Sequence, residues 1–247
     1  MAYACCDMFA RMVPPQGLLV FFPSYSALAS AHASWLTPAA DGGPSVLERI
    51  KKLKTLVVEP REASELVEAV QTYQNAVKSS VLYGTGGAIL FAVCRGKLSE
   101  GVDFADAACR GVVITGLPLP PIVDAKIELK RQFLDARRAA AARQPGGLAE
   151  PGGGVVGGAT SGVIGGSSAL VPASSMLTGE AWYQQQAMRA VNQAVGRVIR
   201  HVDDYGAVLL CESRFAKRAW AGQLVSQSVS QSVSQAGRQA GRQTGRQ

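Results

Sequence analysis

The run GLLVFF, residues 17–22, decides the fold class because six apolar residues follow one another with no polar position between them. Gly17 and Pro23 bound the run. A strand with one face in water alternates polar and apolar residues, so a continuous apolar run predicts a strand buried on both faces. Further runs of this kind are TLVVE (55–59), GAILFAV (87–93), GVVITG (111–116) and YGAVLLC (205–211).

Helical patterns separate these runs. Ser24 can cap a helix that extends to about Trp35. Further helices are predicted around 47–54, 61–80, 124–142 and 178–200. Alternating strands and helices predict an α/β fold with a three-layer parallel sheet and helices on both faces. Ligands of such sheets bind beyond the carboxyl ends of the strands, so the chemistry is expected in the loops that follow them.

Composition sets wide bounds on function. The chain has 247 residues, of which 47% are hydrophobic, enough for one sizeable α/β domain with tails. Its net charge of +7 weakly favours an acidic partner such as nucleic acid. The five cysteines form no CxxC pair and there are only two histidines, so neither a zinc site nor a disulfide framework is predicted. The sequence contains no run of 18 apolar residues, and no membrane span or membrane partner is expected.

Two segments differ from the rest in composition. Residues 144–176 are rich in Gly, Ala, Ser and Pro and are expected to form a flexible insertion. Residues 221–247 carry SQSV and GRQ repeats and are expected to be a disordered tail. One domain is therefore predicted over residues 1–220, with the insertion inside it.

The stretch QAVGRVIRH, residues 193–201, carries the strongest local signal. In a helix, Gln193, Gly196, Arg197 and Arg200 fall on one face. Two arginines one turn apart supply rigid charged forks that match phosphate geometry and can neutralise charge during phosphoryl transfer. The alternative is a solvated basic face, but such a face has no use for a glycine that costs about 1 kcal/mol.

The loop CRGKLSEGVDF, residues 94–104, is a second candidate. Gly101 would let the backbone approach a ligand closely, and Asp103 could accept hydrogen bonds from ribose hydroxyls. Lys97 and Ser99 could contact phosphate oxygens. The loop by itself is equally compatible with an ordinary polar surface.

Four segments together resemble a known family in order and spacing. They are GLLVFFPSY (17–25), AVCRGKLSEGVDF (92–104), RGVVITGLPLPP (110–121) and the long segment 180–216. They resemble motifs IV, V, a TGLP segment and motif VI of the C-terminal RecA-like lobe of superfamily 2 DNA helicases of the XPD/FANCJ class. Cys109 before Arg110 and the long insertion at 144–176 depart from the family pattern.

The resemblance implies roles for individual residues. Arg200 matches the arginine finger, and Arg197 a second catalytic arginine. Nucleotide contacts are implied for Gln193, Gly196, Gly101 and Asp103, and DNA-backbone contacts for Ser24, Tyr25, Lys97 and Ser99. A segment after motif VI is matched by Asp204, Tyr205, Arg214 and Phe215, of which Tyr205 and Phe215 are interpreted as packing residues.

Two helicase elements are absent from this sequence. It has no GxxxxGK[ST] loop and no Asp-Glu-x-His box. The resemblance therefore implies a composite site in which ATP and Mg²⁺ are shared with a first RecA-like lobe. That lobe would also carry an iron–sulfur cluster, and this chain alone would hydrolyse no ATP.

The implied setting is DNA repair or telomere maintenance in the nucleus, acting on single strands and duplex junctions. Two alternatives stay open. One is a non-catalytic module that binds single-stranded nucleic acid. The other is an unrelated α/β nucleotide-binding or interaction protein.

Overall fold

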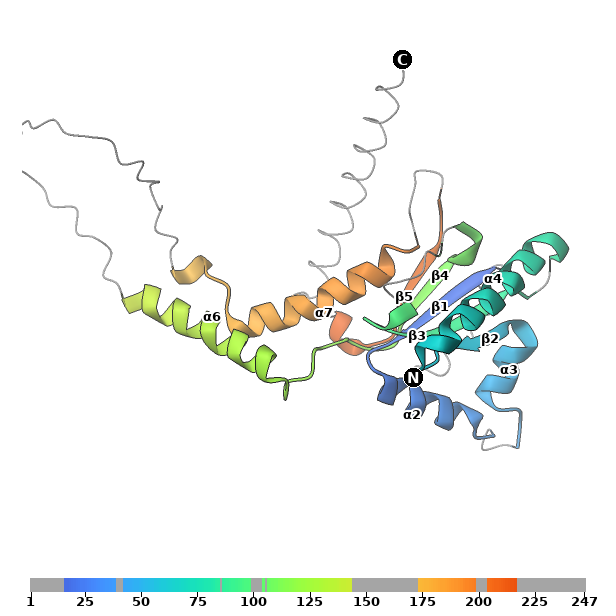
Figure 1. Cartoon of the computed structure of the whole chain (residues 1–247), viewed down its shortest axis with the longest axis horizontal. Helices are drawn as coiled ribbons and strands as arrows, with labels where there is room; N and C mark the ends of the chain where they lie inside the picture. The colour runs from blue at the N-terminus through green and yellow to red at the C-terminus, as the bar shows by residue number, and fades with distance from the viewer. Residues whose placement is uncertain are drawn as a thin grey trace, which may run out of the picture. The chain divides into compact units, whose positions relative to one another are not determined.

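A five-stranded parallel sheet forms the centre of the protein. The computed structural model describes residues 16–38, 42–84, 86–98, 104, 106–143, 173–198 and 204–216. The strands are β1 (Gly17–Phe22), β2 (Thr55–Val58), β3 (Ala88–Val93), β4 (Gly111–Ile114) and β5 (Ala207–Leu210). They lie in the order β2-β3-β1-β4-β5, and every neighbouring pair is parallel (Figure 1). The predicted α/β class and all five strands are confirmed.

The helices are α2 (Tyr25–Leu36), α3 (Val46–Leu53), α4 (Leu66–Tyr83), α6 (Ala125–Arg143) and α7 (Gly179–Val195). Short 3₁₀ helices cover 63–65, 106–108, 173–175 and 213–216. Ser24 caps α2 as predicted, since its side chain accepts a hydrogen bond from the Ala27 N–H at 3.2 Å. Gly84, with a φ of +68°, ends α4 in the left-handed conformation that glycine adopts without strain. No described helix is long and apolar enough to cross a membrane.

Helix α7 is shorter than predicted. Its last helical residue is Val195, so Gly196 and Arg197 lie in the turn that follows it. The Gly196 N–H still bonds to the Asn192 carbonyl at 2.8 Å, but the Arg197 N–H bonds to the Ala194 carbonyl at 3.3 Å. The chain therefore tightens from i−4 to i−3 bonding at the glycine, which has low helix propensity. The prediction of one continuous helical face through Gly196 and Arg197 is wrong.

Side chains of β1 alternate between two apolar layers. Leu19 and Phe21 face the layer that includes Tyr73 of α4 and Val191 of α7. Leu18, Val20 and Phe22 face the other layer, with Trp35 of α2 and Ile50 of α3. Burying each of these large side chains contributes about 1.5–3 kcal/mol. The sheet is thus covered on both faces, as continuous apolar strands require.

The chain divides into two compact units. The first comprises residues up to Leu119 and from Gln186 onward, and the second comprises Pro120–Gln185. Within the second unit, Arg131 of α6 pairs with Glu180 at 3.0 Å. The Tyr183 hydroxyl donates to the Pro120 carbonyl at 2.7 Å.

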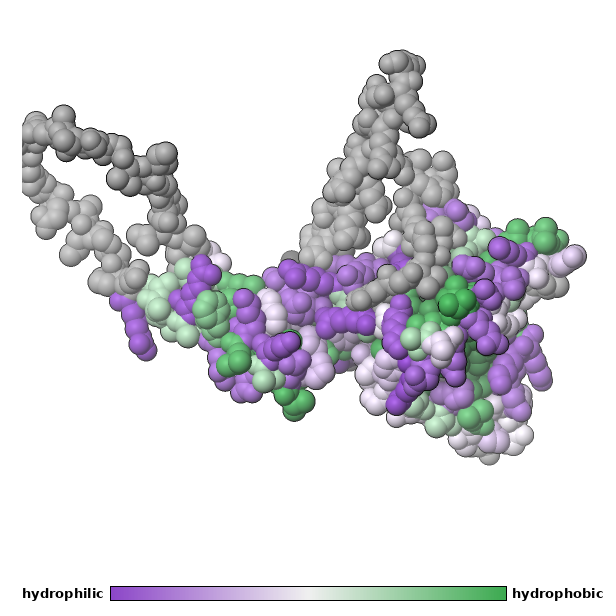
Figure 2. All heavy atoms as spheres, viewed as in Figure 1, coloured by the Kyte–Doolittle hydropathy of each residue, from purple (hydrophilic) through white to green (hydrophobic). Residues whose placement is uncertain are grey.

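Large apolar side chains also remain on the surface of the second unit, where Figure 2 shows them in green. Leu129 and Phe133 of α6 are among these exposed residues. Most of the predicted insertion (144–172) and all of the predicted tail (221–247) lie outside the described residues, while residues 173–175 form a 3₁₀ helix.

Candidate functional site

Glu59 organises the carboxyl edge of the sheet. It directly follows β2 and is only 3% exposed. Its Oε2 accepts a hydrogen bond from the Val93 N–H at 2.7 Å. If β2 were longer, one of its backbone carbonyls would accept this bond, so the side chain of Glu59 replaces a strand partner. Its Oε1 accepts from the Leu98 N–H at 3.2 Å and from the Tyr25 hydroxyl at 3.0 Å. One buried carboxylate thus fixes the end of β3, the loop after it and the start of α2.

Ser24 and Tyr25, both predicted to contact DNA, lie at this edge. Because Ser24 caps α2, its hydroxyl is engaged with the helix backbone. The Tyr25 hydroxyl is held by Glu59. Burial, and then the charge of Glu59, raise the pKa of Tyr25 to about 12. The Tyr25 hydroxyl therefore stays a neutral donor, and this residue positions the edge.

Three exposed cations surround this arrangement, on the loops after β2 and β3. The Arg61 guanidinium carbon lies 5.8 Å from the centroid of the Tyr25 ring. The Lys97 ammonium donates to the Arg61 carbonyl at 2.9 Å, which joins the two loops. Arg95 occupies the left-handed region with a φ of 62°. A Cβ at Gly96 would lie 2.6 Å from Glu59 Oε1, so only glycine lets the loop pass this carboxylate.

A second carboxylate ties the ends of β4 and β5 together. Glu212, after β5, accepts a hydrogen bond from the Leu117 N–H at 3.0 Å. Arg214 donates to the same carboxylate through Nε and through a terminal nitrogen at 2.8 Å. These bonds from Arg214 are the main cause that lowers the pKa of Glu212. Phe215 is buried in the core, as predicted for a packing residue.

Arg197 lies at the opposite, amino edge of the sheet. Its guanidinium carbon is 5.9 Å from the centroid of the Phe104 ring. Cys109, which precedes β4, lies close to Arg197. Burial raises the pKa of the Cys109 thiol to about 12, and the positive charge of Arg197 partly opposes this rise. Gln193 and Gly196 are exposed near the same end of α7.

Arg110 fastens the amino ends of three strands. It pairs with the buried carboxylate of Asp204 and donates to the Tyr205 carbonyl at 2.9 Å, both just before β5. Its Nε donates to the Gln16 side chain at 3.0 Å, just before β1. The guanidinium carbon lies 4.3 Å from the centroid of the Tyr205 ring, so this ring packs against the arginine although it is 57% exposed.

Among the described residues, the structure separates Arg197 from the predicted DNA-contact residues. Ser24, Tyr25 and Lys97 are at the carboxyl edge, where ligands were expected. Arg197 is at the amino edge, away from the loops in which the chemistry was expected. Four further predicted site residues lie outside the described residues: Ser99, Gly101, Asp103 and Arg200.

Glu59 was not predicted as a site residue. The sequence carries a signal for it, because a carboxylate ends an otherwise apolar strand run and Pro60 follows it. A charged residue at such a position is seldom buried unless partners hold it. In the described part of the chain, no three His, Cys, Asp or Glu side chains gather closely enough to hold a metal ion.

A family model described as the helicase C-terminal domain matches residues 9–231. The chain belongs to this family. This match confirms the resemblance to the C-terminal lobe of this class of helicases, and the relatives named next confirm the predicted likeness to the regulator of telomere elongation helicase.

Named relatives support this assignment. The chain is 42% identical over 207 residues to the "Regulator of telomere elongation helicase 1 homolog" of Arabidopsis thaliana, covering 84% of the chain. It is 44% identical over 207 residues to the "Regulator of telomere elongation helicase 1" of Rattus norvegicus, again covering 84% of the chain. It spans only 17% and 13% of the length of these two proteins. A solved structure titled "XPD_Helicase" aligns over 90% of the chain and 29% of its own length, with a TM-score of 0.47 and 19% identity.

Proposed function

We propose that this chain is the second motor lobe of an ATP-dependent DNA helicase that acts in DNA repair or telomere maintenance in the nucleus. Membership of the helicase C-terminal domain family supports the proposal. The observation that carries it is the separation of Arg197, at the amino edge of the sheet, from three exposed cations at the carboxyl edge, Arg61, Arg95 and Lys97.

The amino edge would complete an ATP site with a first lobe. The guanidinium of Arg197 is permanently charged and partly buried, with the Phe104 ring beside it, so it suits a phosphate oxygen better than a mobile lysine would. Arg200 would stabilise charge developing at the γ-phosphate during its transfer. Gln193, Gly196, Gly101 and Asp103 would contact the nucleotide. The first lobe would supply the phosphate loop, the Mg²⁺ ligands and the iron–sulfur cluster.

The carboxyl edge would bind the DNA backbone. Arg61, Arg95 and Lys97 provide charge for phosphates, and the N-terminus of the 12-residue helix α2 adds backbone N–H groups beside Ser24. Since Glu59 and the helix cap already engage the Tyr25 and Ser24 side chains, the backbone N–H groups of α2 are the better candidates for direct contact. Ser99 would add a further contact.

Leu98 and Phe104 are six positions apart in the sequence. Glu59 holds Leu98 at the carboxyl edge, and Phe104 lies beside Arg197 at the amino edge. A movement of Arg197 and Phe104 on phosphate binding would therefore act close in the chain to the DNA-binding loop. This connection would couple ATP hydrolysis to movement along the strand.

The test uses a chimera in which residues 9–231 replace the matching segment of the Oryza sativa relative, to which the chain is 42% identical over 219 residues. The chimera is expected to hydrolyse ATP in the presence of single-stranded DNA. Arg200→Ala should reduce this activity at least ~100-fold, as loss of a phosphate-stabilising arginine does, while DNA affinity stays within about twofold. Arg137→Ala, an exposed arginine on α6, is the matched control and should be neutral.

The exposed cations at the carboxyl edge also suit a non-catalytic module that binds single strands. The same chimera separates the two functions. If the chimera binds DNA fully and its rate of ATP hydrolysis is unchanged by Arg200→Ala, the binding module is favoured and the motor-lobe proposal is overturned.

A further inference from the structure

Strand β2 is an edge strand of the sheet, and among the described strands it pairs with β3 alone. The Thr55 and Glu59 N–H groups donate to the Gly87 and Phe91 carbonyls of the β3 side, so alternation turns the backbone groups of Leu56 and Val58 outward. An edge of this kind offers hydrogen-bonding groups to an added strand.

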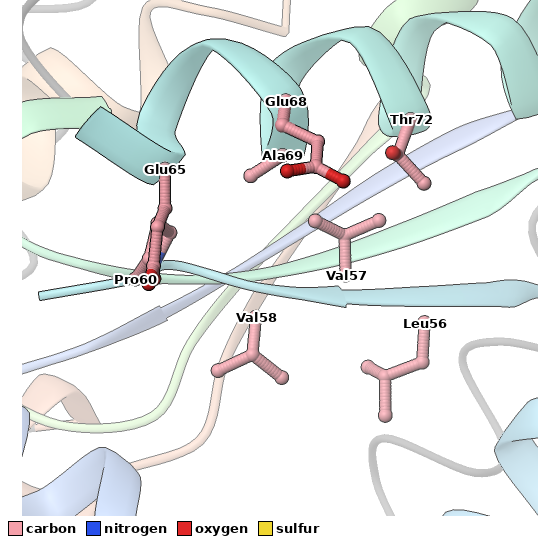
Figure 3. A pocket seen from close by; sticks show the side chains of 8 residues that line it. All are labelled: Leu56, Val57, Val58, Pro60, Glu65, Glu68, Ala69 and Thr72. Carbon is pink, nitrogen blue, oxygen red and sulfur yellow. The ribbon is translucent and has the colours of Figure 1, made fainter. Parts of the chain in front are cut away.

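Two hollows of about 360 and 350 Å³ lie one after the other along this edge between β2 and α4, one beside residues 56–58 and one beside residues 51–55. We call the two hollows together the groove. On the helix side, their lining begins with Glu65, directly before α4, and continues along one face of α4 (Glu68, Ala69, Thr72, Ala76 and Ser79). Figure 3 shows Val57 pointing toward this face, and Leu56 and Val58 pointing away from it.

The two ends of the groove carry opposite charge. Glu65 and Glu68, both exposed, line it at the carboxyl end of β2. Lys51 and Lys52, also exposed, line it at the amino end. Lys54 lies at that end too, but its ammonium is turned inward to the Gln16 and Gly86 carbonyls at 3.0 and 2.8 Å.

We propose that this groove binds an extended segment of a partner protein, which adds to β2 as a sixth strand. The segment would carry an acidic residue opposite Lys51 and Lys52 and a basic residue opposite Glu65 and Glu68. Its backbone would pair with Leu56 and Val58, and an apolar side chain would rest near Val57 and Ala69. Nucleic acid is a poor occupant, because the two glutamates repel phosphates.

The rise of a strand sets the length of the segment. Residues 55–58 span about 10 Å, or three steps of roughly 3.3 Å each. The lysines and glutamates lie toward the two ends of this stretch and beyond, so the two charges of the segment should stand about four to five positions apart. A segment parallel to β2 carries its acidic residue first, and an antiparallel one carries its basic residue first. This rule links the sequence of the partner to its direction of binding.

The experiment uses fluorescent capped octapeptides of alternating Val and Thr, with Asp near one end and Lys near the other, in both orders. Anisotropy measures binding to the full chain. One order is expected to bind. Proline is placed in turn at each of the two central positions, and it should abolish binding at the one whose N–H faces β2, since proline lacks the N–H. Glu65→Gln with Glu68→Gln, and separately Lys51→Gln with Lys52→Gln, should each weaken binding about fivefold, the size expected of exposed ion pairs. Lys126→Gln with Lys130→Gln on α6 is the matched control and should have no effect.

Amide exchange measured by NMR tests the placement directly. The bound peptide should slow exchange of the Leu56 and Val58 amides at least ~10-fold and leave the inward-facing Val57 amide unchanged. Absence of binding by both peptides at millimolar concentration would overturn the proposal. Binding that survives both proline substitutions, or that protects neither Leu56 nor Val58, would overturn it as well. Both readouts are independent of ATP hydrolysis, so this proposal can fail while the motor-lobe proposal stands.

Discussion

Replacing Glu59 by glutamine tests how one buried carboxylate holds the carboxyl edge together. The Glu59 carboxylate accepts three hydrogen bonds, from Val93, Leu98 and Tyr25. Glutamine keeps the shape but offers one acceptor oxygen and one N–H₂ donor group. If the glutamine oxygen keeps the hydrogen bonds from the Leu98 N–H and the Tyr25 hydroxyl, its N–H₂ group faces the Val93 N–H. The buried Val93 N–H then loses its acceptor.

The size of the effect follows from these contacts. An unsatisfied buried donor costs about 1–3 kcal/mol, and the two remaining bonds lose the charge that strengthens them. We therefore expect Glu59→Gln to lower the free energy of unfolding by about 3 kcal/mol. For a domain of this size the melting temperature should fall by about 6–12 °C in a circular dichroism melt.

Two variants sharpen the interpretation. Glu62→Gln makes the same chemical change at an exposed position three residues away and should stay within about 0.5 kcal/mol of the parent. Tyr25→Phe removes a single donor and should cost about 0.5–1.5 kcal/mol. Its effect should shrink when combined with Glu59→Gln, because the two residues share a hydrogen bond. A Glu59→Gln melting temperature within 1 °C of the parent would refute the role assigned to this carboxylate.

Three further measurements test other contacts. Burial lowers the pKa of Lys54 to about 8, so between pH 8 and 10.5 the unfolded chain binds more protons than the folded one. The stability of the parent relative to Lys54→Met should therefore rise with pH across that window. A difference in the free energy of urea unfolding that does not change with pH would contradict this. Burial raises the pKa of both Cys94 and Cys109 to about 12, so neither thiol should react with iodoacetamide at pH 8 until the chain unfolds, and early labelling in peptide mass maps would contradict their burial. Arg110→Ala leaves the buried Asp204 carboxylate without its arginine and should cost about 3–5 kcal/mol in urea unfolding, whereas a change below 1 kcal/mol would show that this pair does not fasten the strands.

The fold could be predicted from the sequence because its strands are continuously apolar. Residues 17–22 and 87–93 have no polar position, and burial on both faces leaves the parallel sheet as the consistent arrangement. The end of α7 was less predictable. Apolar spacing continues through Val198, so only the low helix propensity of Gly196 signals the turn.

The site was harder to predict than the fold, because it depends on contacts between residues far apart in the sequence. Glu59 accepts hydrogen bonds from residues 34 and 39 positions away, and no local pattern encodes such partners. Lys97 and Arg197 were predicted to contact phosphates from their chemistry and spacing, and Ser24 was predicted as a helix cap, while its role in DNA binding was implied only by the family resemblance. Their division between two edges of the sheet follows from the direction of α7, which returns the chain to the amino ends of the strands before β5.

In the proposed helicase, this lobe supplies arginines to an ATP site that a first lobe completes. The single-turnover rate of ATP hydrolysis, with single-stranded DNA present, tests this for the isolated chain, the chimera and its Arg200→Ala variant. We expect no hydrolysis by the isolated chain, rapid hydrolysis by the chimera, and a loss of at least ~100-fold in the variant with DNA binding retained. Hydrolysis by the isolated chain, or equal rates in the chimera and its variant, would contradict the claim.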